Sequence, residues 1–198
     1  MGLKARNPRE MLEAIRTVPT SSIYYHTHRF LQQHHYLSPE PPNDFAYWFT
    51  NILVLRELAE ALASVNTVSF QSMEELRAEF VRILEGYLKK KKPEMDCPEG
   101  HEFHFMSCVT FVFRTPHLAG NLEEFEAAID KISVNSLYFH MFEARLRIKR
   151  DENDFSIWLK ELGQPKLAEE LAKMDPYNMT LDSLRQKIKR AVKKYGKH

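Results

Sequence analysis

Glycine is scarce in this sequence, with 6 residues among 198. Loops that hold the phosphates of a nucleotide are rich in glycine, and neither GxGxxG nor GxxxxGKS/T occurs anywhere in the chain. The absence of both motifs argues against the common classes of nucleotide-dependent enzyme. The GxSxG motif of serine hydrolases is missing as well, so the sequence identifies no catalytic nucleophile and implies no particular cofactor.

An excess of charge of one sign is also lacking. The chain has 28 Lys and Arg against 27 Asp and Glu, which leaves a net charge of +1. Proteins that bind nucleic acids or anionic membranes usually show a marked basic excess. Lysines do cluster at 89–92 and 193–197, where they complement the dipole at the ends of two predicted helices. We therefore expect no nucleic-acid partner.

Long apolar runs and secretory features are absent too. No stretch of 18 apolar residues occurs, and charges are spread through residues 1–20, where a signal peptide would have an apolar region. These observations predict a cytoplasmic protein without a membrane partner. Cys97 and Cys108 are the only cysteines, and in a reducing compartment we expect both to be free thiols.

A repeat organises what is present. The five residues 22–26 (SIYYH) match 136–140 (SLYFH) at every position by identity or similarity. Further along, the string N-D-F-x-x-W occurs at 43–48 and again at 153–158, so both tryptophans fall at matching places. We interpret the chain as two copies of one unit joined by a dissimilar segment. The predicted divisions are 8–92 for the first copy, 93–120 for the connection and 121–198 for the second copy.

Each copy has the pattern of a string of short helices. The first helix shows apolar residues at i, i+3, i+4 and i+7, which is the spacing of one helical face. These residues are Met11, Ala14, Ile15 and Val18 in copy one and Phe125, Ala128, Ile129 and Ile132 in copy two. The predicted fold class is mainly α, with two multi-helix units related by a pseudo-twofold axis and packed as one globular body.

Capping residues indicate where the other helices begin. Ser22 and Ser136 are predicted to start helices that run to about Tyr36 and Lys149. The remaining predicted boundaries are N-caps at Asn43 or Asp44, Asn153 or Asp154, Ser72 and Thr180, and a break at Gly163 and Pro165. Trp48 and Trp158 fall on apolar helical faces, and we expect both to be core residues.

The connecting segment has a different period. From 102 to 113 the apolar residues alternate with other residues, and most of them are aromatic or β-branched. This pattern predicts a β element. A lone strand leaves its main-chain groups unpaired, so it must form a hairpin, pair with a stretch such as 65–70, or pair with a second chain. The third case predicts a homodimer.

Histidines are the main candidates for chemistry. Copy one holds His26, His28, His34 and His35 in its second helix, and Asp44 is one of the nearest carboxylates. Imidazoles together with a carboxylate are typical ligands of zinc or iron, although no carboxylate lies between Ser21 and Ser38. A second arrangement, C-x3-H-x2-H-x3-C, is formed by Cys97, His101, His104 and Cys108. Each set is a hypothesis for a metal site.

The repeated histidine permits two interpretations. His26 and His140 occur in both copies, so the fold itself can require them, as buried imidazoles that bond the backbone or Asp44 and Asp154. Alternatively, the two copies bring their second helices to a central cleft that binds a small polar or anionic ligand. The predicted ligand-binding residues are Tyr24, His26, His28, Arg29, Tyr138 and His140.

Two long strings in the sequence carry a family resemblance. They are SSIYYHTHRFLQQHHYLSPEPPNDFAYW in copy one and NSLYFHMFEARLR, followed by NDFSIWL, in copy two. With them the chain resembles a family of bacterial and archaeal proteins of about this length, a domain of unknown function associated with glycosyltransferase genes. The resemblance covers nearly the whole chain. It implies a link to carbohydrate metabolism and no particular catalytic residue.

Two functions follow from these patterns. The first is a non-enzymatic ligand-binding or regulatory module linked to carbohydrate metabolism, with its site where the second helices approach each other. The alternative is a metal-dependent hydrolase that uses His26, His28, His34, His35 and Asp44. The sequence leaves open whether the protein is an enzyme.

Overall fold

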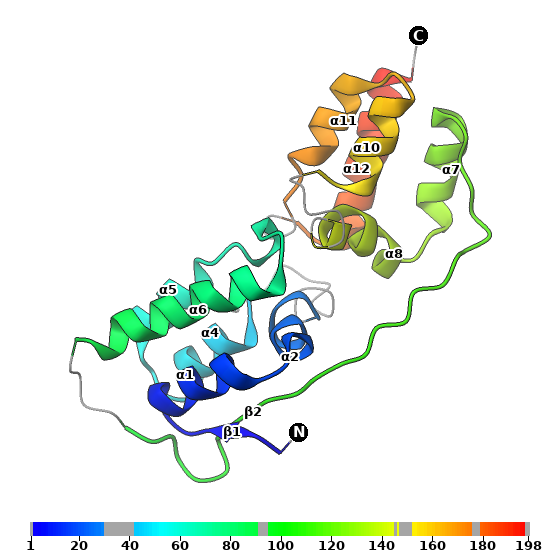
Figure 1. The fold of residues 1–198 in the computed structure, drawn as a ribbon. Helices are drawn as coiled ribbons and strands as arrows, with labels where there is room; N and C mark the ends of the chain where they lie inside the picture. Colours follow the sequence, from blue (N-terminus) through cyan, green and yellow to red (C-terminus); the bar gives the residue numbers. More distant parts are fainter. Residues whose placement is uncertain are drawn as a thin grey trace. The chain divides into compact units, whose positions relative to one another are not determined.

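The structure, a computed structural model, describes residues 2–29, 42–90, 95–144, 146, 152–175 and 179–196. These residues are mainly helical, with a small two-stranded sheet, which confirms the predicted fold class at that level. They divide into two compact units, of which unit 1 extends to Thr110 and unit 2 begins at Phe111 (Figure 1). None of the described helices is long and apolar enough to cross a membrane.

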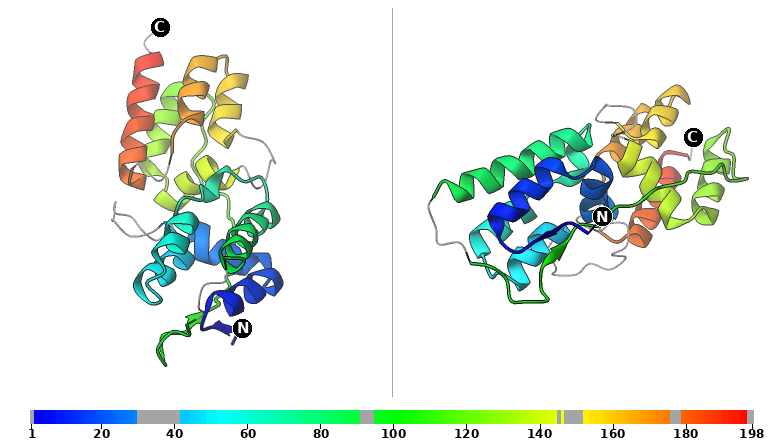
Figure 2. Two further views of the ribbon diagram at one scale, coloured as in Figure 1. Left: turned by 90° about the vertical axis from the view of Figure 1, so that its left-hand side faces the viewer. Right: turned by 60° about the horizontal axis from the view of Figure 1, so that its bottom comes forward.

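Unit 1 is built from short helices and one pair of strands. Its elements in chain order are β1 (Lys4–Ala5), α1 (Pro8–Thr17), α2 (Thr20–Tyr24), the π-helix η1 (Tyr25–Arg29), α4 (Asp44–Asn51), α5 (Arg56–Ala63), the 3-10 helix η2 (Thr67–Ser69), α6 (Met73–Leu88) and β2 (Phe103–His104). Both views of Figure 2 show α6 beside α1, and residues of the two helices are in contact.

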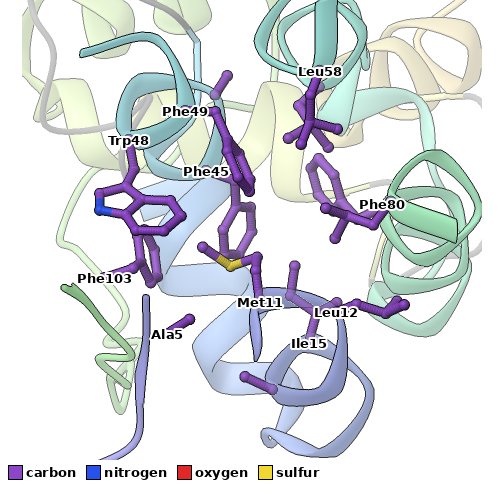
Figure 3. Close-up of a cluster of buried hydrophobic side chains, with 14 of the residues drawn as sticks. Ala5, Met11, Leu12, Ile15, Phe45, Trp48, Phe49, Leu58, Phe80 and Phe103 are labelled. Atoms are coloured by element: carbon purple, nitrogen blue, oxygen red, sulfur yellow. The ribbon is translucent and has the colours of Figure 1, made fainter. Parts of the chain in front are cut away.

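The core of unit 1 is formed by the apolar faces of these helices. Side chains from α1, α4, α5 and α6 meet there, and β1 and β2 close one side (Figure 3). The fully buried residues include Met11, Ile15, Phe45, Phe49, Leu58 and Phe80. Phe45 lies near the centre, because its ring packs against Phe80 at 5.2 Å and against Phe103 at 5.3 Å, centroid to centroid.

Unit 2 has its helices in a similar order. Its elements are α7 (Leu122–Lys131), α8 (Val134–Tyr138), the π-helix η3 (Phe139–Glu143), α10 (Asp154–Glu161), α11 (Pro165–Ala172) and α12 (Leu181–Tyr195). As in unit 1, the last helix packs on the first, and α10 packs on α11. The break predicted at Gly163 and Pro165 lies between these two helices, and Pro165 is the first residue of α11.

Some of the predicted N-caps are confirmed by the structure and others are not. Ser72 and Thr180 are the N-caps of α6 and α12, as predicted, and each accepts a hydrogen bond from the main chain three residues on. Ser22 and Ser136 are not caps, since α2 begins at Thr20 and the cap of α8 is Ser133. Each helix begins earlier because Pro19 or Ser133 already provides the non-helical first residue. The ends predicted at Tyr36 and Lys149 lie outside the described residues.

The predicted β element is much shorter in the structure. Only Phe103 and His104 form a strand, and they pair antiparallel with Ala5 and Lys4. The predicted partner 65–70 forms the 3-10 helix η2 and its flanks instead. Next to this strand pair, the main-chain N–H of Phe105 donates a further hydrogen bond to the Leu3 carbonyl at 3.0 Å.

The loop between α4 and α5 contains a strained residue. Val54 has a φ of 54° and its side chain is 61% exposed. A β-branched residue is disfavoured in this left-handed region, whereas asparagine tolerates it. Replacing Val54 with Asn should therefore raise the free energy of unfolding by about 1 kcal/mol. Urea unfolding measures the change, and an equal or lower stability would mean that the loop is not strained in solution.

Candidate functional site

A histidine and an aspartate form the same pair in each unit. His26 Nδ1 lies 2.7 Å from Asp44 Oδ2, and His140 Nδ1 lies 2.7 Å from Asp154 Oδ2. In both cases the histidine is the second residue of the π-helix and the aspartate is the first residue of the next described helix. A carboxylate only accepts hydrogen bonds, so Nδ1 carries a proton in each pair, and Nε2 is the nitrogen left to accept a further hydrogen bond. Segments of π-helix are often found at functional sites.

The pair in unit 1 is closed. His26 is 3% exposed, and its Nε2 accepts the main-chain N–H of Met106 at 2.9 Å. The ring packs between aromatic residues, with Phe103 at 4.7 Å and Phe45 at 5.5 Å between centroids. Both ring nitrogens are thus bonded inside the core, which confirms the predicted buried imidazole that bonds the backbone and Asp44.

A single segment provides this closure. We call residues 97–106, which contain β2, the cover segment. Its Phe103 packs on Phe45 and Trp48, and its His101 carbonyl accepts the indole N–H of Trp48 at 2.8 Å. Trp48 is therefore 5% exposed, as predicted for a core residue.

The pair in unit 2 is open. The His140 side chain is 40% exposed, and among the described residues none donates a hydrogen bond to its Nε2. Phe155 lies against the imidazole at 5.2 Å, and both Phe155 and Trp158 are only partly buried. The prediction that Trp158 is a core residue is therefore wrong, because within the described part of unit 2 no segment covers it.

These side chains share one surface, which we call the His140 face and define by His140, Asp154, Phe155 and Trp158. Phe155 and Trp158 are three residues apart on α10 and so lie on the same side of that helix. Both rings also contact the buried Phe125 of α7, at 5.1 and 5.2 Å. The face offers an acceptor at His140 Nε2, a donor at the Trp158 indole and apolar area between them.

The other predicted ligand-binding residues occupy different surroundings. His28 is fully buried, stacks on Tyr24 at 5.5 Å, and has a pKa lowered by burial to about 4. Arg29 is half-buried, and Tyr138 is fully buried beside Phe142 at 5.4 Å. That these residues bind a ligand in a cleft between the copies stays a prediction.

The described residues do not support a metal site. No group of three or more His, Cys, Asp or Glu side chains among them is placed to hold an ion. His26 cannot coordinate a metal without losing its bond to Met106 or Asp44. The C-x3-H-x2-H-x3-C hypothesis is wrong, because Cys97, His101, His104 and Cys108 do not gather. His34 and His35 lie outside the described residues.

Sequence reasoning missed the difference between the two units. It found the repeated His26 and His140 but placed Trp48 and Trp158 in equivalent surroundings. The signal was the connecting segment itself, since the residues that cover the site in unit 1 belong to the stretch without a counterpart in the repeat.

Comparisons with known proteins give a family and a fold. The model of a family of unknown function, DUF5752, matches residues 1–193. The solved structure of OrfY from Thermoproteus tenax is similar, with a TM-score of 0.82 and 28% identity over 100% of this chain and 90% of that chain. A search of curated proteins finds no match. The predicted resemblance to a family of unknown function is confirmed, and the association with glycosyltransferase genes stays a prediction.

Proposed function

The chain belongs to the DUF5752 family, whose function is not known, and from this premise we propose that it is a non-enzymatic binding module with the His140 face as its ligand site. The observation that carries the proposal is the contrast between the two His–Asp pairs. In unit 1 the pair accepts a main-chain N–H from an extended segment, and in unit 2 the corresponding nitrogen is accessible.

The cover segment supports a definite ligand chemistry. It contacts the Trp48 and His26 side chains through one carbonyl, at His101, and one N–H, at Met106, with Phe103 and Phe105 between them. The His140 face has the matching set, which is a donor at Trp158, an acceptor at His140 and the apolar ring of Phe155. A ligand that offers an N–H, a carbonyl and apolar groups in a row fits this set, and an extended peptide does so.

The comparison between the two faces rests on a second inference, which is that the units are copies of one ancestral unit. Matching contacts that do not involve the histidines support it. The Asn43 amide donates to the Leu62 carbonyl and the Asn153 amide to the Leu171 carbonyl. Likewise, Arg77 donates to the Ile15 carbonyl in unit 1, and Arg185 donates to the Ile129 carbonyl in unit 2.

Binding at this face would serve a regulatory role. A bound ligand covers the His140 face and so changes the surface that a partner protein contacts, and no covalent bond is broken or formed. The resemblance implied a link to carbohydrate metabolism, so sugar phosphates are the second ligand class to compare with peptides. Such ligands have hydroxyl and anionic groups that an imidazole can bind, and sugars stack on aromatic rings such as Trp158.

Nuclear magnetic resonance of the two tryptophan indoles tests the proposal. The chain has 2 tryptophans, so each indole N–H gives its own signal, one in each unit. Titration with a peptide of sequence HEFHFM, copied from residues 101–106, should shift the Trp158 signal and leave the Trp48 signal in place. His140→Ala should weaken this binding about tenfold, which corresponds to one lost hydrogen bond at a wet surface.

A matched control is available at His104, an exposed histidine of unit 1. His104→Ala should bind the peptide as the wild type does. If glucose 6-phosphate rather than the peptide shifts the Trp158 signal, the face is a ligand site of another class. If neither compound shifts it, the proposed function is wrong.

A further inference from the structure

The segment that leads into unit 2 exposes its apolar side chains. Residues 109–114, which we call the docking segment, run without helix or strand (Figure 1). Phe111 and Phe113 are 75% and 80% exposed, and their rings lie on the same side of the segment, 6.5 Å apart. Within the described part of the chain, its main-chain groups make no backbone hydrogen bond. Unpaired extended segments with such side chains readily join another surface.

The docking segment repeats the pattern of the cover segment. Phe103-His104-Phe105 corresponds to Phe111-Val112-Phe113, eight residues later. The same offset places the Val109 carbonyl where the cover segment has the His101 carbonyl, and the Arg114 N–H where it has the Met106 N–H. The chain thus contains one Phe-x-Phe segment that is bound in unit 1 and one that is exposed.

We propose that the docking segment of one copy of the chain binds the His140 face of a second copy, and the inference rests on the proposed function of that face. Phe111 and Phe113 pack on Phe155 and Trp158. The Arg114 N–H donates to His140 Nε2, and the Val109 carbonyl accepts the indole N–H of Trp158. The two copies exchange segments reciprocally, which closes a twofold dimer.

Pro116 prevents the docking segment from making the corresponding contact with the His140 face of its own chain. In unit 1, the Phe105 N–H donates to the carbonyl of Leu3. Leu3 lies four positions before Asn7, the N-cap of α1. The N-cap of α7 is Asn121, so the corresponding bond would join Phe113 to His117 through a turn of three residues, 114–116. Such a turn ends in a left-handed residue, whereas proline holds φ near −65°. A second copy needs no turn.

Sedimentation and light scattering of the full chain test the dimer. The wild type should be dimeric in a concentration-dependent way. The double variant Phe111→Ser with Phe113→Ser should raise the dissociation constant about thirtyfold or more, as loss of aromatic anchors does at other interfaces. Both side chains are exposed in the monomer, so the variant should keep the helical spectrum. Val112→Ser alters the opposite side of the segment and should leave the dimer unchanged.

A mixture of two defective variants gives the sharpest result. His140→Ala with Trp158→Ala removes the face but leaves the docking segment intact. Neither double variant should dimerise alone, and together they should form a heterodimer through the one face and the one segment that remain. A monomeric wild type, or a dimer that both double variants retain, overturns the inference. In that case peptide binding at Trp158 shows separately whether the proposed function stands.

Discussion

Replacing Trp48 with Ala is expected to lower the free energy of unfolding by about 3 to 5 kcal/mol, the range for a large aromatic residue removed from a core. The indole is 5% exposed and contacts Phe49 at 5.0 Å and Phe103 at 5.9 Å. Its removal leaves a cavity beneath the cover segment. It also removes the hydrogen bond that the indole N–H donates to the His101 carbonyl in the folded chain.

Trp158 provides the matched comparison. It occupies the corresponding position on α10 but is only half-buried, so Trp158→Ala should cost about 1 to 2 kcal/mol. Urea unfolding followed by circular dichroism measures both variants. In the Trp48→Ala protein the remaining indole reports on unit 2 alone, so its fluorescence shows whether the loss is confined to unit 1. Equal costs for the two substitutions would mean that Trp158 is covered in solution.

Trp48→Phe separates packing from hydrogen bonding at this position. Phenylalanine keeps an aromatic ring against Phe103 but has no N–H to donate. The cost should be about 1 kcal/mol, the typical net worth of one hydrogen bond, because the bond to His101 is only partly buried. A cost as large as that of Trp48→Ala would assign the whole effect to the indole bond with His101.

The helices could be predicted because the information that defines them is local. The apolar stripe of α1 and the caps Ser72 and Thr180 depend on residues within one or two turns. The π-helices could not be predicted, since η1 and η3 carry no distinct period. Their wider turn belongs to a fold in which His26 and His140 reach the first residue of the next described helix, 18 and 14 positions away.

The strand partner lay beyond sequence reasoning for a different reason. β1 consists of Lys4 and Ala5 only, and two residues show no alternation that could be recognised. Its pairing with β2 is set by tertiary contacts across almost a hundred positions of chain, a distance at which pattern gives no register. The sequence did indicate that residues 109–113 have the composition of a strand, and in the described structure that stretch is exposed instead.

At the candidate site, the sequence repeat predicts which histidines matter but does not predict whether they are exposed. Comparing the two matching stretches of sequence identified His26 and His140, because a residue that occurs in both stretches can be recognised from the sequence. Whether each histidine is open depends on the cover segment, which lies in the unrepeated stretch and reaches His26 only in the folded chain. The exposure of His26 and His140 could therefore not be predicted from the two matching stretches of sequence.

Position 28 shows the same contrast in a measurable way. His28 is fully buried, and burial lowers its pKa to about 4, whereas Phe142 fills the corresponding position of unit 2 beside Tyr138. Among the described residues, His28 Nε2 has no hydrogen-bond partner. Its Nδ1 lies 3.2 Å from Thr27 Oγ1. A proton added to this ring would therefore be poorly solvated in the folded state.

The free energy of unfolding of the wild type should consequently fall as the pH is lowered from about 6.5 to about 4. Over that interval the unfolded chain, with an ordinary histidine pKa near 6.5, binds a proton that the folded chain does not. Each pH unit costs about 1.4 kcal/mol, so the total approaches about 3 kcal/mol at the lower end. Above about pH 6.5 both states are neutral at His28, and the effect vanishes.

His28→Phe installs the residue of unit 2 and removes the titrating group. Urea unfolding of both proteins, from about pH 7 to about pH 4, should show their difference in stability shifting by about 3 kcal/mol in favour of the variant. Carboxylates and the other histidines titrate in both proteins, so their contributions cancel in the difference. Parallel curves would show that His28 is solvated or paired when protonated, which would return it to the set of residues available to a ligand.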